Sequence, residues 1–588
     1  MRGGDYSFLR AFVGRLFWFT VIICFFLSIP ENILAADPVL NVPGSRQQPG
    51  ISRPELPEFS PPTSGEEPIL PPVKLWEEKE PMLSTIPRVM VNEIRIIGNS
   101  IFPEEELAAI TAPYENRVIT NNELQELRLR LTRYYIDKGY INSGAVIPDQ
   151  KVTDGVITIR IIEGHLSDVR ISGNSWLRTP YIQKRLLWAD SGSPLNIDDL
   201  QQKLQLLDRN PLLKRVNGEL GPGLVPGEAI LRVQVEEARP YQFNLRIAND
   251  RSPSSGELRA EARAVHRNVS GWGDSLGVRY GLTEGTDDYS VYYSIPLTSR
   301  DLSLTLAYSK NDSNVIEEPF DLIDIESESE TIEVALRYPI IKTLTREFAI
   351  SLSGQYRSSK TWLLGQPFSF SPGVVDGECK VSVLRLSVDW TERSQQQVLA
   401  IRSVFSNGID AFDATINSGE PDSEFFTWLG QVQWARRINL IPDSQLIFRT
   451  DVQLTDRSLL PLEKFAVGGA NSVRGYRENQ MVRDNGLVSS LEYRIPLFRL
   501  PLPLISKGAE DGTLQLALFG DWGRSWNKDY PTPDPETIGS YGAGLRWLIS
   551  SRMNASIYYG KATEDFINPD ENSLQDDGIH FQFNWQVL

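Results

Sequence analysis

From about residue 241 to the C-terminus, apolar and polar side chains alternate in one short segment after another. The final segment sets Phe581, Phe583, Trp585 and Val587 against Gln582, Asn584 and Gln586. Because side chains along a strand point alternately to opposite faces, this period predicts strands with one apolar and one polar face. A transmembrane β-barrel has such strands, and so does a soluble β-sandwich.

The number of strands and the lengths of their connections favour the barrel. We expect about sixteen strands, near 242–250, 257–266, 272–282, 287–296, 300–308, 328–338, 345–356, 380–390, 395–404, 424–436, 443–455, 485–495, 512–522, 538–548, 552–560 and 579–587. An even number suits a closed bacterial barrel, in which every strand edge is paired. Long connections interleave with short ones, apart from a long turn at 496–511. Short turns are typical of the periplasmic side and long loops of the outside.

The overall composition conceals this architecture and argues against several functions. A mean hydropathy of −0.26 suggests a soluble protein, but the two faces of barrel strands average to such values. A net charge of −17 opposes nucleic-acid binding, which depends on Lys and Arg. Two cysteines exclude a disulfide scaffold and a thiolate zinc module, and three scattered histidines make no convincing metal site. We therefore expect no cofactor and no metal.

The N-terminal 87 residues are expected to contribute no folded domain. Arg2, Arg10 and Arg15 precede an apolar run at 16–29, so residues 1–36 are interpreted as a cleaved signal peptide. The alternative is a single membrane anchor, for which the run is short. Residues 37–87 hold twelve of the 38 prolines and are expected to form an extended linker.

A tandem repeat follows the linker. Residues 93–100 and 168–175 align without gaps, and each segment ends in Gly-Asn-Ser. In both copies the periodicity predicts the order β-α-α-β-β. The expected elements are strands near 93–97, 145–147 and 156–162 with helices near 103–110 and 122–138, then strands near 167–172, 216–220 and 229–235 with helices near 179–188 and 196–208. We place the two domains at 88–164 and 165–240.

This order resembles the POTRA domain, and the first copy is most similar to the first POTRA of two-partner secretion transporters. The residues that carry the second resemblance are Tyr134, Tyr135, Gly139, Tyr140, Pro148 and Gln150. The resemblance implies periplasmic domains that receive an unfolded substrate, partly by adding a strand to an exposed sheet edge. It makes these six residues candidates for substrate recognition, whereas Leu124, Leu127 and Leu131 are interpreted as core.

The longest barrel loop, 456–484, contains a second resemblance. Its Gly-Gly segment is not followed by Gly-Lys-Ser/Thr, so a nucleotide site is not expected. The tetrapeptide Val473, Arg474, Gly475 and Tyr476 is similar to the hallmark of the POTRA-plus-barrel translocase superfamily, in which this loop folds back into the lumen. Our strand count places it between strands 11 and 12. On strand 13, Phe519, Asp521 and Gly523 match the superfamily's partner motif Phe-x-Asp-x-Gly.

The two motifs predict an ion pair inside the barrel. An arginine carried into the lumen needs a partner, because an unpaired and partly desolvated charge costs several kcal/mol. Alternation turns Asp521 toward the lumen, where its two oxygens suit the guanidinium fork of Arg474. The alternative is a solvated loop arginine and an unrelated lumenal carboxylate. Glu492 and Arg494 on strand 12 belong to the surrounding charge network or simply line water.

Together these features resemble a two-partner secretion transporter of the haemolysin/haemagglutinin secretion-activation type. The resemblance implies an outer-membrane β-barrel of about 16 antiparallel strands at 241–588, preceded by two periplasmic POTRA domains. It implies a lipid-embedded protein, not an enzyme, that exports one large unfolded partner without nucleotide or nucleic acid. The alternatives are a barrel-assembly factor of the same superfamily and a passive porin. Relatives can carry an N-terminal helix that plugs the pore. Residues 37–87 are too rich in proline for us to predict such a helix here.

Overall fold

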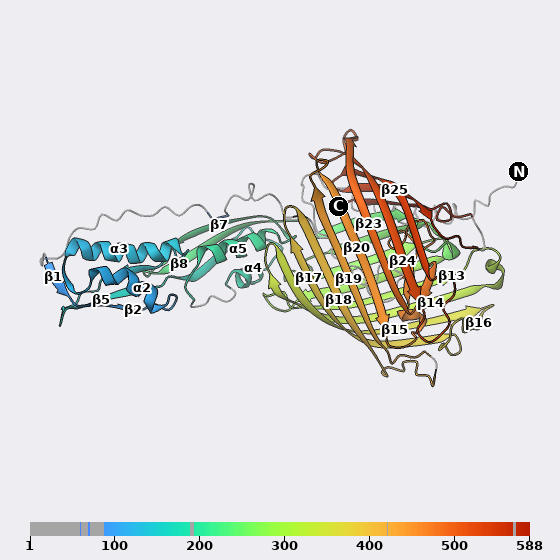
Figure 1. Cartoon of the computed structure of the whole chain (residues 1–588), viewed down its shortest axis with the longest axis horizontal. Helices are drawn as coiled ribbons and strands as arrows, with labels where there is room; N and C mark the ends of the chain where they lie inside the picture. Colours follow the sequence, from blue (N-terminus) through green and yellow to red (C-terminus); the bar gives the residue numbers. More distant parts are fainter. Residues whose placement is uncertain (1–58, 60–68, 71–87, 188–192, 420, 569–571) are drawn as a thin grey trace.

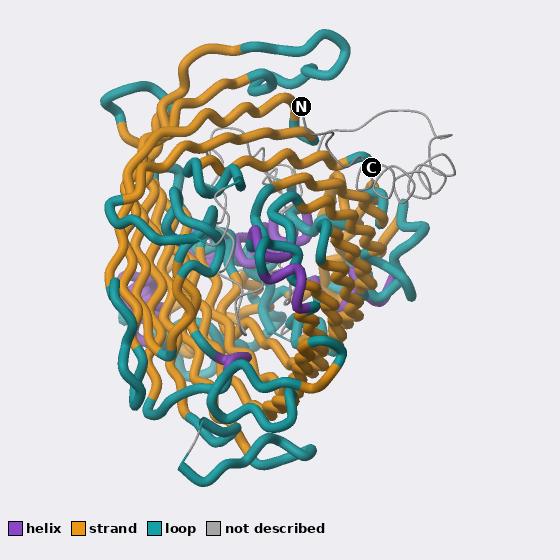
Figure 2. Tube along the Cα trace, turned by 90° about the vertical axis from the view of Figure 1, so that its right-hand side faces the viewer, coloured by secondary structure: helices purple, strands orange, loops and turns teal. Residues whose placement is uncertain are grey.

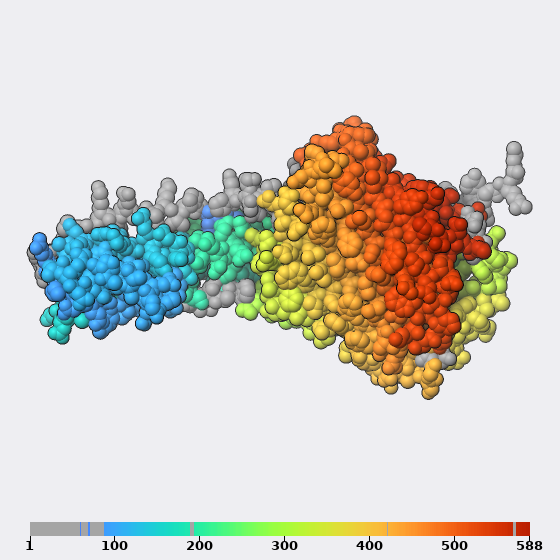
Figure 3. Space-filling view, in the orientation of Figure 1, coloured from blue at the N-terminus to red at the C-terminus, as the bar shows by residue number. Residues whose placement is uncertain are grey.

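The computed structural model describes residues 59, 69–70, 88–187, 193–419, 421–568 and 572–588. The predicted signal peptide at 1–36 and all of the predicted linker except Phe59, Ile69 and Leu70 lie outside the described residues. Two small α/β units stand in a row beside a large barrel, which makes the molecule elongated (Figures 1 and 3). Within the described ranges, no helix is long and apolar enough to cross a membrane.

The first unit has the predicted β-α-α-β-β order together with a small sheet that the sequence analysis did not predict. Its elements are β1 (Arg88–Val91), β2 (Glu93–Ile97), α2 (Glu104–Thr111), η2 (Ala112–Tyr114), β3 (Arg117–Thr120), α3 (Asn121–Asp137), β4 (Gly144–Val146) and β5 (Val156–Ile162). The main sheet has the order β2-β5-β4, with β2 parallel to β5. The additional sheet pairs β1 with β3, and these four-residue strands are too short to show a period.

Helix α3 begins where its sequence provides a capping box. The Thr120 hydroxyl accepts a hydrogen bond from the Glu123 N–H, and the Glu123 carboxylate accepts one from the Thr120 N–H. That backbone hydrogen bond, with further bonds from Arg117 and the Thr120 hydroxyl, lowers the pKa of Glu123 to about 2. One face of α3 buries Leu127 and Leu131, as predicted, so this helix closes the core of the first unit.

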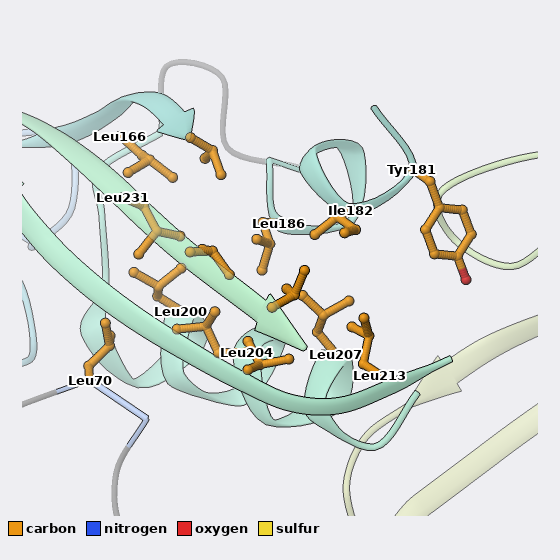
Figure 4. Close-up of a cluster of buried hydrophobic side chains, with 14 of the residues drawn as sticks. Leu70, Leu166, Tyr181, Ile182, Leu186, Leu200, Leu204, Leu207, Leu213 and Leu231 are labelled. Atoms are coloured by element: carbon orange, nitrogen blue, oxygen red, sulfur yellow. The ribbon is translucent and has the colours of Figure 1, made fainter. Parts of the chain in front are cut away.

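The second unit repeats the order of the first and packs its own core (Figure 4). Its elements are β6 (His165–Ser172), α4 (Thr179–Leu186), α5 (Ile197–Asp208), β7 (Leu213–Pro222) and β8 (Glu228–Glu237). The sheet order is β6-β8-β7, so β7 is an edge strand. The core also contains Leu70, which belongs to the segment that precedes the first unit.

Backbone hydrogen bonds join the two units directly. The N–H of Leu195 donates to the Gly164 carbonyl at 2.6 Å, and the N–H of Ile197 donates to the Gly139 carbonyl at 2.9 Å. The Asn142 side chain donates to the Gly227 carbonyl at 3.0 Å. Because these bonds come from several places on both units, they restrain the angle between them.

The barrel is closed and antiparallel, as predicted. Its sixteen long strands are β9 (Tyr241–Ala248), β10 (Arg259–His266), β11 (Ser275–Leu282), β12 (Thr286–Pro296), β13 (Ser303–Asn314), β14 (Ile325–Lys342), β15 (Arg346–Leu363), β17 (Glu378–Arg393), β18 (Gln397–Ile409), β19 (Phe426–Ile438), β20 (Ser444–Thr455), β23 (Asn485–Arg499), β24 (Thr513–Trp526), β25 (Thr537–Ser550), β26 (Met553–Ala562) and β27 (Ile579–Gln586), with the two-residue β16 (Gln366–Pro367) beside β15. Strand β27 pairs with β9 and closes the ring. The two-residue period revealed the strands because exposed apolar side chains recur at every second position, as at Ile332, Val334 and Leu336 of β14.

The second unit contacts three turns at one end of the barrel. The Arg178 N–H donates to the Gly271 carbonyl at 2.9 Å, and Arg185 forms an ion pair with Asp301 at 2.6 Å. Arg209 donates to the Leu344 carbonyl at 2.9 Å. These residues belong to turns after alternate strands, so the repeat pair stands at the short-turn end, as the connection lengths predicted.

Candidate functional site

The loop that connects β20 to β23, residues 456–484, enters the barrel; we call it the inward loop. Its two limbs form a small antiparallel ribbon of β21 (Phe465–Val467) and β22 (Met481–Arg483). Apolar side chains of this ribbon pack against those of the wall strands. Viewed along the barrel, loop segments lie within the ring of strands (Figure 2). The predicted motif at 473–476 occupies the far end of this loop.

Arg474 meets Asp521 through three hydrogen bonds. Its Nε lies 2.8 Å from Oδ2 and its Nη2 lies 2.9 Å from Oδ1, which is the two-pronged geometry expected for a guanidinium and a carboxylate. The backbone N–H of Arg474 also donates to Oδ2, at 3.0 Å. Both side chains are buried. The carboxylate of Asp521 therefore holds both the side chain and the backbone of the loop at this point.

Glu492 completes the charge balance around Arg474. Its carboxylate accepts from Arg474 Nη1 on one oxygen and from Arg494 Nε, at 2.6 Å, on the other. Two arginines and two carboxylates thus form a group of linked ion pairs, which we call the Arg474 cluster: Arg474, Arg494, Glu492 and Asp521. Pairing each of these arginines with a carboxylate avoids the large desolvation cost of a lone buried charge. Glu492 therefore bonds directly to Arg474 of the inward loop. The sequence alone left open whether Glu492 belongs to a charge network or lines water.

Two aromatic rings frame the same guanidinium. Its central carbon lies 3.6 Å from the centroid of the Phe519 ring and 4.9 Å from that of Tyr558. A cation over an aromatic face gains roughly 0.5–2 kcal/mol, more where water is excluded. The Phe519 of the second motif thus has a contact of its own with the loop.

Gly475 lets the loop backbone touch the barrel wall. Its φ is +89°, and a Cβ added there would lie 2.7 Å from the carbonyl oxygen of Gly560 on β26. Its N–H donates to Nε2 of His580 on β27, at 3.1 Å. A side chain at this position would combine an unfavourable left-handed backbone with an overlap against another backbone.

The remaining two positions of the motif also contact the wall. Val473 is fully buried, and a Cβ on Gly523 would lie 2.9 Å from its Cγ2, so the absent side chain at 523 leaves room for it. The Tyr476 hydroxyl donates to the Gly539 carbonyl at 3.0 Å and accepts from the N–H groups of Thr563 and Glu564. Every residue of the tetrapeptide therefore makes a specific contact with the wall.

Sequence reasoning missed a second set of ionic contacts at the entry of the loop. Glu463 is buried and lies 2.8 Å from Arg385 Nη2 on β17 and 2.7 Å from Arg357 Nη1 on β15. Arg385 also donates to Gln355 at 3.0 Å and to Ser406 at 2.6 Å. We call Arg357, Arg385 and Glu463 the Glu463 cluster. These partners lie far apart in the sequence and in no motif, so no local pattern could have revealed them.

Replacing Glu463 with alanine should loosen the entry of the loop. The change leaves two buried guanidinium groups without their shared carboxylate, and breaking such a group typically costs about 3–5 kcal/mol. We expect normal barrel insertion, faster cleavage of the inward loop by added protease, and secretion reduced severalfold. Glu424→Ala removes an exposed carboxylate from another loop and should leave both properties unchanged. Cleavage of Glu463→Ala at the wild-type rate would contradict an anchoring role.

A third contact joins the loop to neighbouring connections at the long-loop end. Arg477 Nη2 lies 2.7 Å from Asp576 Oδ2, and Arg477 also pairs with Glu317. The N–H of Glu478 donates to the Gln575 side chain at 2.8 Å. The inward loop is thus held at its entry, at the motif and just beyond it.

The six candidate recognition residues of the first unit mostly contact that unit itself. Tyr135 is fully buried, and its hydroxyl donates to the Asn99 side chain at 2.7 Å. Gln150 exchanges two 2.7 Å hydrogen bonds with the backbone of Thr158 on β5. Gly139 accepts the bond from the second unit described above. These three residues have structural contacts within the protein, and their role in recognition stays a prediction.

The other three candidates of the first unit are half-buried. Tyr134 and Tyr140 pack edge-on around Phe102, with ring centroids 4.9 and 5.7 Å from its own. The Tyr134 hydroxyl donates to Glu106 on α2, and Pro148 lies between β4 and β5. The recurrent Tyr and Gly-Tyr pattern thus builds an aromatic cluster that joins the two helices of the unit.

Comparison with known proteins now assigns the chain. Residues 227–547 match the family model "Haemolysin secretion/activation protein ShlB/FhaC/HecB", and residues 89–164 match "POTRA domain, ShlB-type". The chain belongs to the haemolysin secretion/activation family. The predicted resemblance is therefore confirmed, and the first unit is a POTRA domain. The second unit shares its topology and precedes the barrel directly.

Individual relatives are distant but similar over most of their length. The chain is 22% identical to the outer membrane transporter CdiB of Dickeya dadantii (strain 3937), over 71% of this chain and 74% of that protein. It is 20% identical to the heme/hemopexin transporter protein HuxB of Haemophilus influenzae (strain 86-028NP), over 79% and 81%. The solved structure of CdiB from Escherichia coli superposes with a TM-score of 0.63 at 20% identity, covering 89% of this chain and 94% of that one.

Membership of this family locates the molecule. It is a secretion transporter of the outer membrane, with its barrel in the bilayer and its POTRA domains in the periplasm. The short-turn end of the barrel, which carries the POTRA domains, therefore faces the periplasm. The long connections and the third contact of the inward loop lie at the outer end.

Proposed function

We propose that this transporter exports one large secreted protein, in unfolded form, through a lumen whose conformation is set by the inward loop. The observation that carries the proposal is the Arg474 cluster, which fastens the end of the loop to β23 and β24 by buried, charge-balanced bonds. A loop fastened at several points has a defined position, and this position sets the shape of the passage beside it.

The proposed role of the cluster is to hold the barrel in a translocation-competent state. Val473, Arg474, Gly475 and Tyr476 are the loop side of this contact, and Phe519, Asp521 and Gly523 are the wall side, with Glu492 and Arg494 balancing the charge. The hydrogen-bonded groups of this contact are largely excluded from water. The contact between the loop and the wall therefore depends on the exact positions of these groups. None of these residues is proposed to perform covalent chemistry.

The POTRA domains are proposed to bind the unfolded partner before it enters the barrel. The three contacts between the second unit and the periplasmic turns restrain this unit beside the barrel entrance. A partner held there has a short path to the lumen. Folding of the exported chain on the outside would make transport directional, since a folded chain does not return.

The test is to delete the gene and compare the surface proteome with that of the parent strain. We expect one large surface or released protein to disappear while other outer-membrane barrels keep their levels. Complementation with the wild-type gene should restore that protein. Depletion of many unrelated barrels would instead identify a barrel-assembly factor and overturn the proposal.

A further inference from the structure

One turn at the periplasmic end of the barrel is longer and more apolar than its neighbours. It connects β23 to β24 and is the exception among the short turns that the sequence already showed. The turns after β17 and β25, at 394–396 and 551–552, contain only polar residues. The β23–β24 turn instead begins Leu-Pro-Leu-Pro-Leu-Ile, at residues 500–505. Figure 3 shows this end of the hairpin as the orange projection at the upper edge of the barrel.

The apolar side chains of this turn are turned outward. Leu504 is 91% exposed, Phe498 is 59% exposed and Leu500 is 50% exposed. Leu504 also has a φ of +71°, a left-handed conformation that leucine rarely adopts. Neighbouring apolar side chains that remain exposed together mark a surface that contacts a partner or a membrane.

The turn has a defined shape because its polar groups bond to one another and to the next turn. The Ser506 hydroxyl donates to the Ile549 carbonyl at the end of β25, at 2.6 Å. The Asp511 carboxylate accepts from the N–H groups of Lys507 and Gly508, both at 2.7 Å. The two prolines of the Leu-Pro-Leu-Pro run have no N–H that would require a partner. These features reduce the cost of removing the turn from water.

The exposed side of the turn continues the outward surface of the barrel wall. Phe498 lies opposite Leu514 of β24, and Leu514 lies opposite Trp547 of β25. Because side chains alternate along a strand, Leu514 shares a face of β24 with the exposed Leu518, and the Arg474 cluster lies on the other face. The indole N–H of Trp547 donates to the Leu500 carbonyl at 3.1 Å. The wall that faces lipid therefore extends without interruption onto the turn.

We propose that the β23–β24 turn is a lipid-binding turn, which inserts Phe498, Leu500, Leu504 and Ile505 into the periplasmic leaflet of the outer membrane. These side chains would lie at the boundary between phospholipid headgroups and acyl chains, where apolar protein surfaces bind. Strands β23 and β24 carry the wall side of the Arg474 cluster. The lipid contact would thus fix the depth of these two strands in the bilayer. This inference does not rest on the proposed export of a partner.

The test places a fluorescent dye on the turn in proteoliposomes. Full-length Leu504→Cys is labelled with a nitrobenzoxadiazole dye and reconstituted with phosphatidylethanolamine and phosphatidylglycerol. Wild-type protein, in which Cys379 is buried, serves as the labelling blank. A nitroxide on the lipid acyl chains quenches a dye that lies among those chains. We expect the dye at 504 to be quenched severalfold more than it is by the same lipid without membrane-inserted protein, in detergent.

Two further positions provide matched controls. Leu224→Cys replaces a leucine that is 96% exposed in the β7–β8 turn, which contacts the first unit through Gly227 and lies away from the barrel. Its dye should remain unquenched. Leu518→Cys labels the lipid-facing side of β24 and should be quenched strongly. Quenching at 504 no greater than at 224 would overturn the proposal. Emission shifted to shorter wavelength without quenching would indicate contact with protein, such as a second copy, and would overturn it as well.

Photocrosslinking of the wild-type chain keeps the proposal testable if a labelled variant does not fold. Phosphatidylethanolamine with a diazirine on an acyl chain is added to the proteoliposomes and irradiated, and attached lipid is located by mass spectrometry. We expect adducts at 497–505 and on the outward side of β24, and none at 223–227. Adducts on β24 without any at 497–505 would overturn the proposal. Neither measurement includes transport, so its outcome is separate from that of the gene deletion.

Discussion

Arg474→Ala should insert into the outer membrane like the wild-type protein yet secrete its partner roughly tenfold less or worse. The substitution removes the guanidinium that Asp521 and Glu492 share, so Asp521 becomes a buried carboxylate without its cationic partner. Leaving a buried charge unpaired typically costs about 3–5 kcal/mol, which is large enough to release the end of the loop. The barrel itself is held by sixteen strand pairings, which this side chain does not contribute to.

The measurement combines partner secretion with two tests of the transporter. Heat-modifiable migration on gels reports a folded barrel, and cleavage by added protease reports release of the inward loop. Arg524→Ala is the matched control, because Arg524 lies on the same strand as Asp521 but pairs with Glu536 at the exposed surface. An exposed pair contributes little, so this variant should secrete normally. Normal secretion by Arg474→Ala would refute the proposed role.

Exchanging the two charges tests whether the residues act through direct contact. The double variant Arg474→Asp with Asp521→Arg should secrete more than either single variant. Recovery should be partial, because the new carboxylate at 474 faces Glu492. A double variant no better than its poorer single parent would contradict direct pairing.

The architecture could be predicted because a membrane barrel imposes its period on every strand. All sixteen long strands lie near their predicted positions, and the inward loop lies between strands 11 and 12 as counted from the sequence. The β1–β3 ribbon was not predicted, since four-residue strands carry too few side chains to establish a period. The alternation of apolar and polar residues thus identifies strands that are long enough to show it several times.

An ion pair of the site could be predicted from the sequence only where both of its residues belong to a known motif. Arg474 and Asp521 each stand in a recognisable tetrapeptide or pentapeptide, whereas Glu463 and its two arginines stand in none. Tyr135 and Gln150 also stand in a recognisable pattern, from which the resemblance implied recognition, but the contacts that they make in this structure are internal to the first unit. Sequence pattern alone does not tell whether a residue serves the fold or a partner.

Gly475→Val should abolish most secretion although it changes no charge. At φ +89° a β-branched side chain is strained by about 1–3 kcal/mol. Its Cβ would also lie 2.7 Å from the Gly560 carbonyl oxygen, and backbone cannot rotate away as a side chain can. The loop would have to retreat from β26, which pulls Arg474 out of reach of Asp521. We therefore expect the same protease sensitivity and secretion defect as in Arg474→Ala.

Gly560→Ala changes the barrel-wall side of the contact between Gly475 and Gly560. It should cause the same secretion defect as Gly475→Val. A Cβ on Gly560 would lie 2.8 Å from the Gly475 nitrogen and 2.9 Å from the Arg474 carbonyl carbon. Gly520→Val is the control, because nothing lies within 4 Å of a Cβ at that position on β24. Full secretion in Gly520→Val together with loss in the other two would assign the defect to the close approach of two backbones. If Gly475→Val and Gly560→Ala both secreted normally, the loop would not need to touch β26, and the ion pair alone would have to hold it.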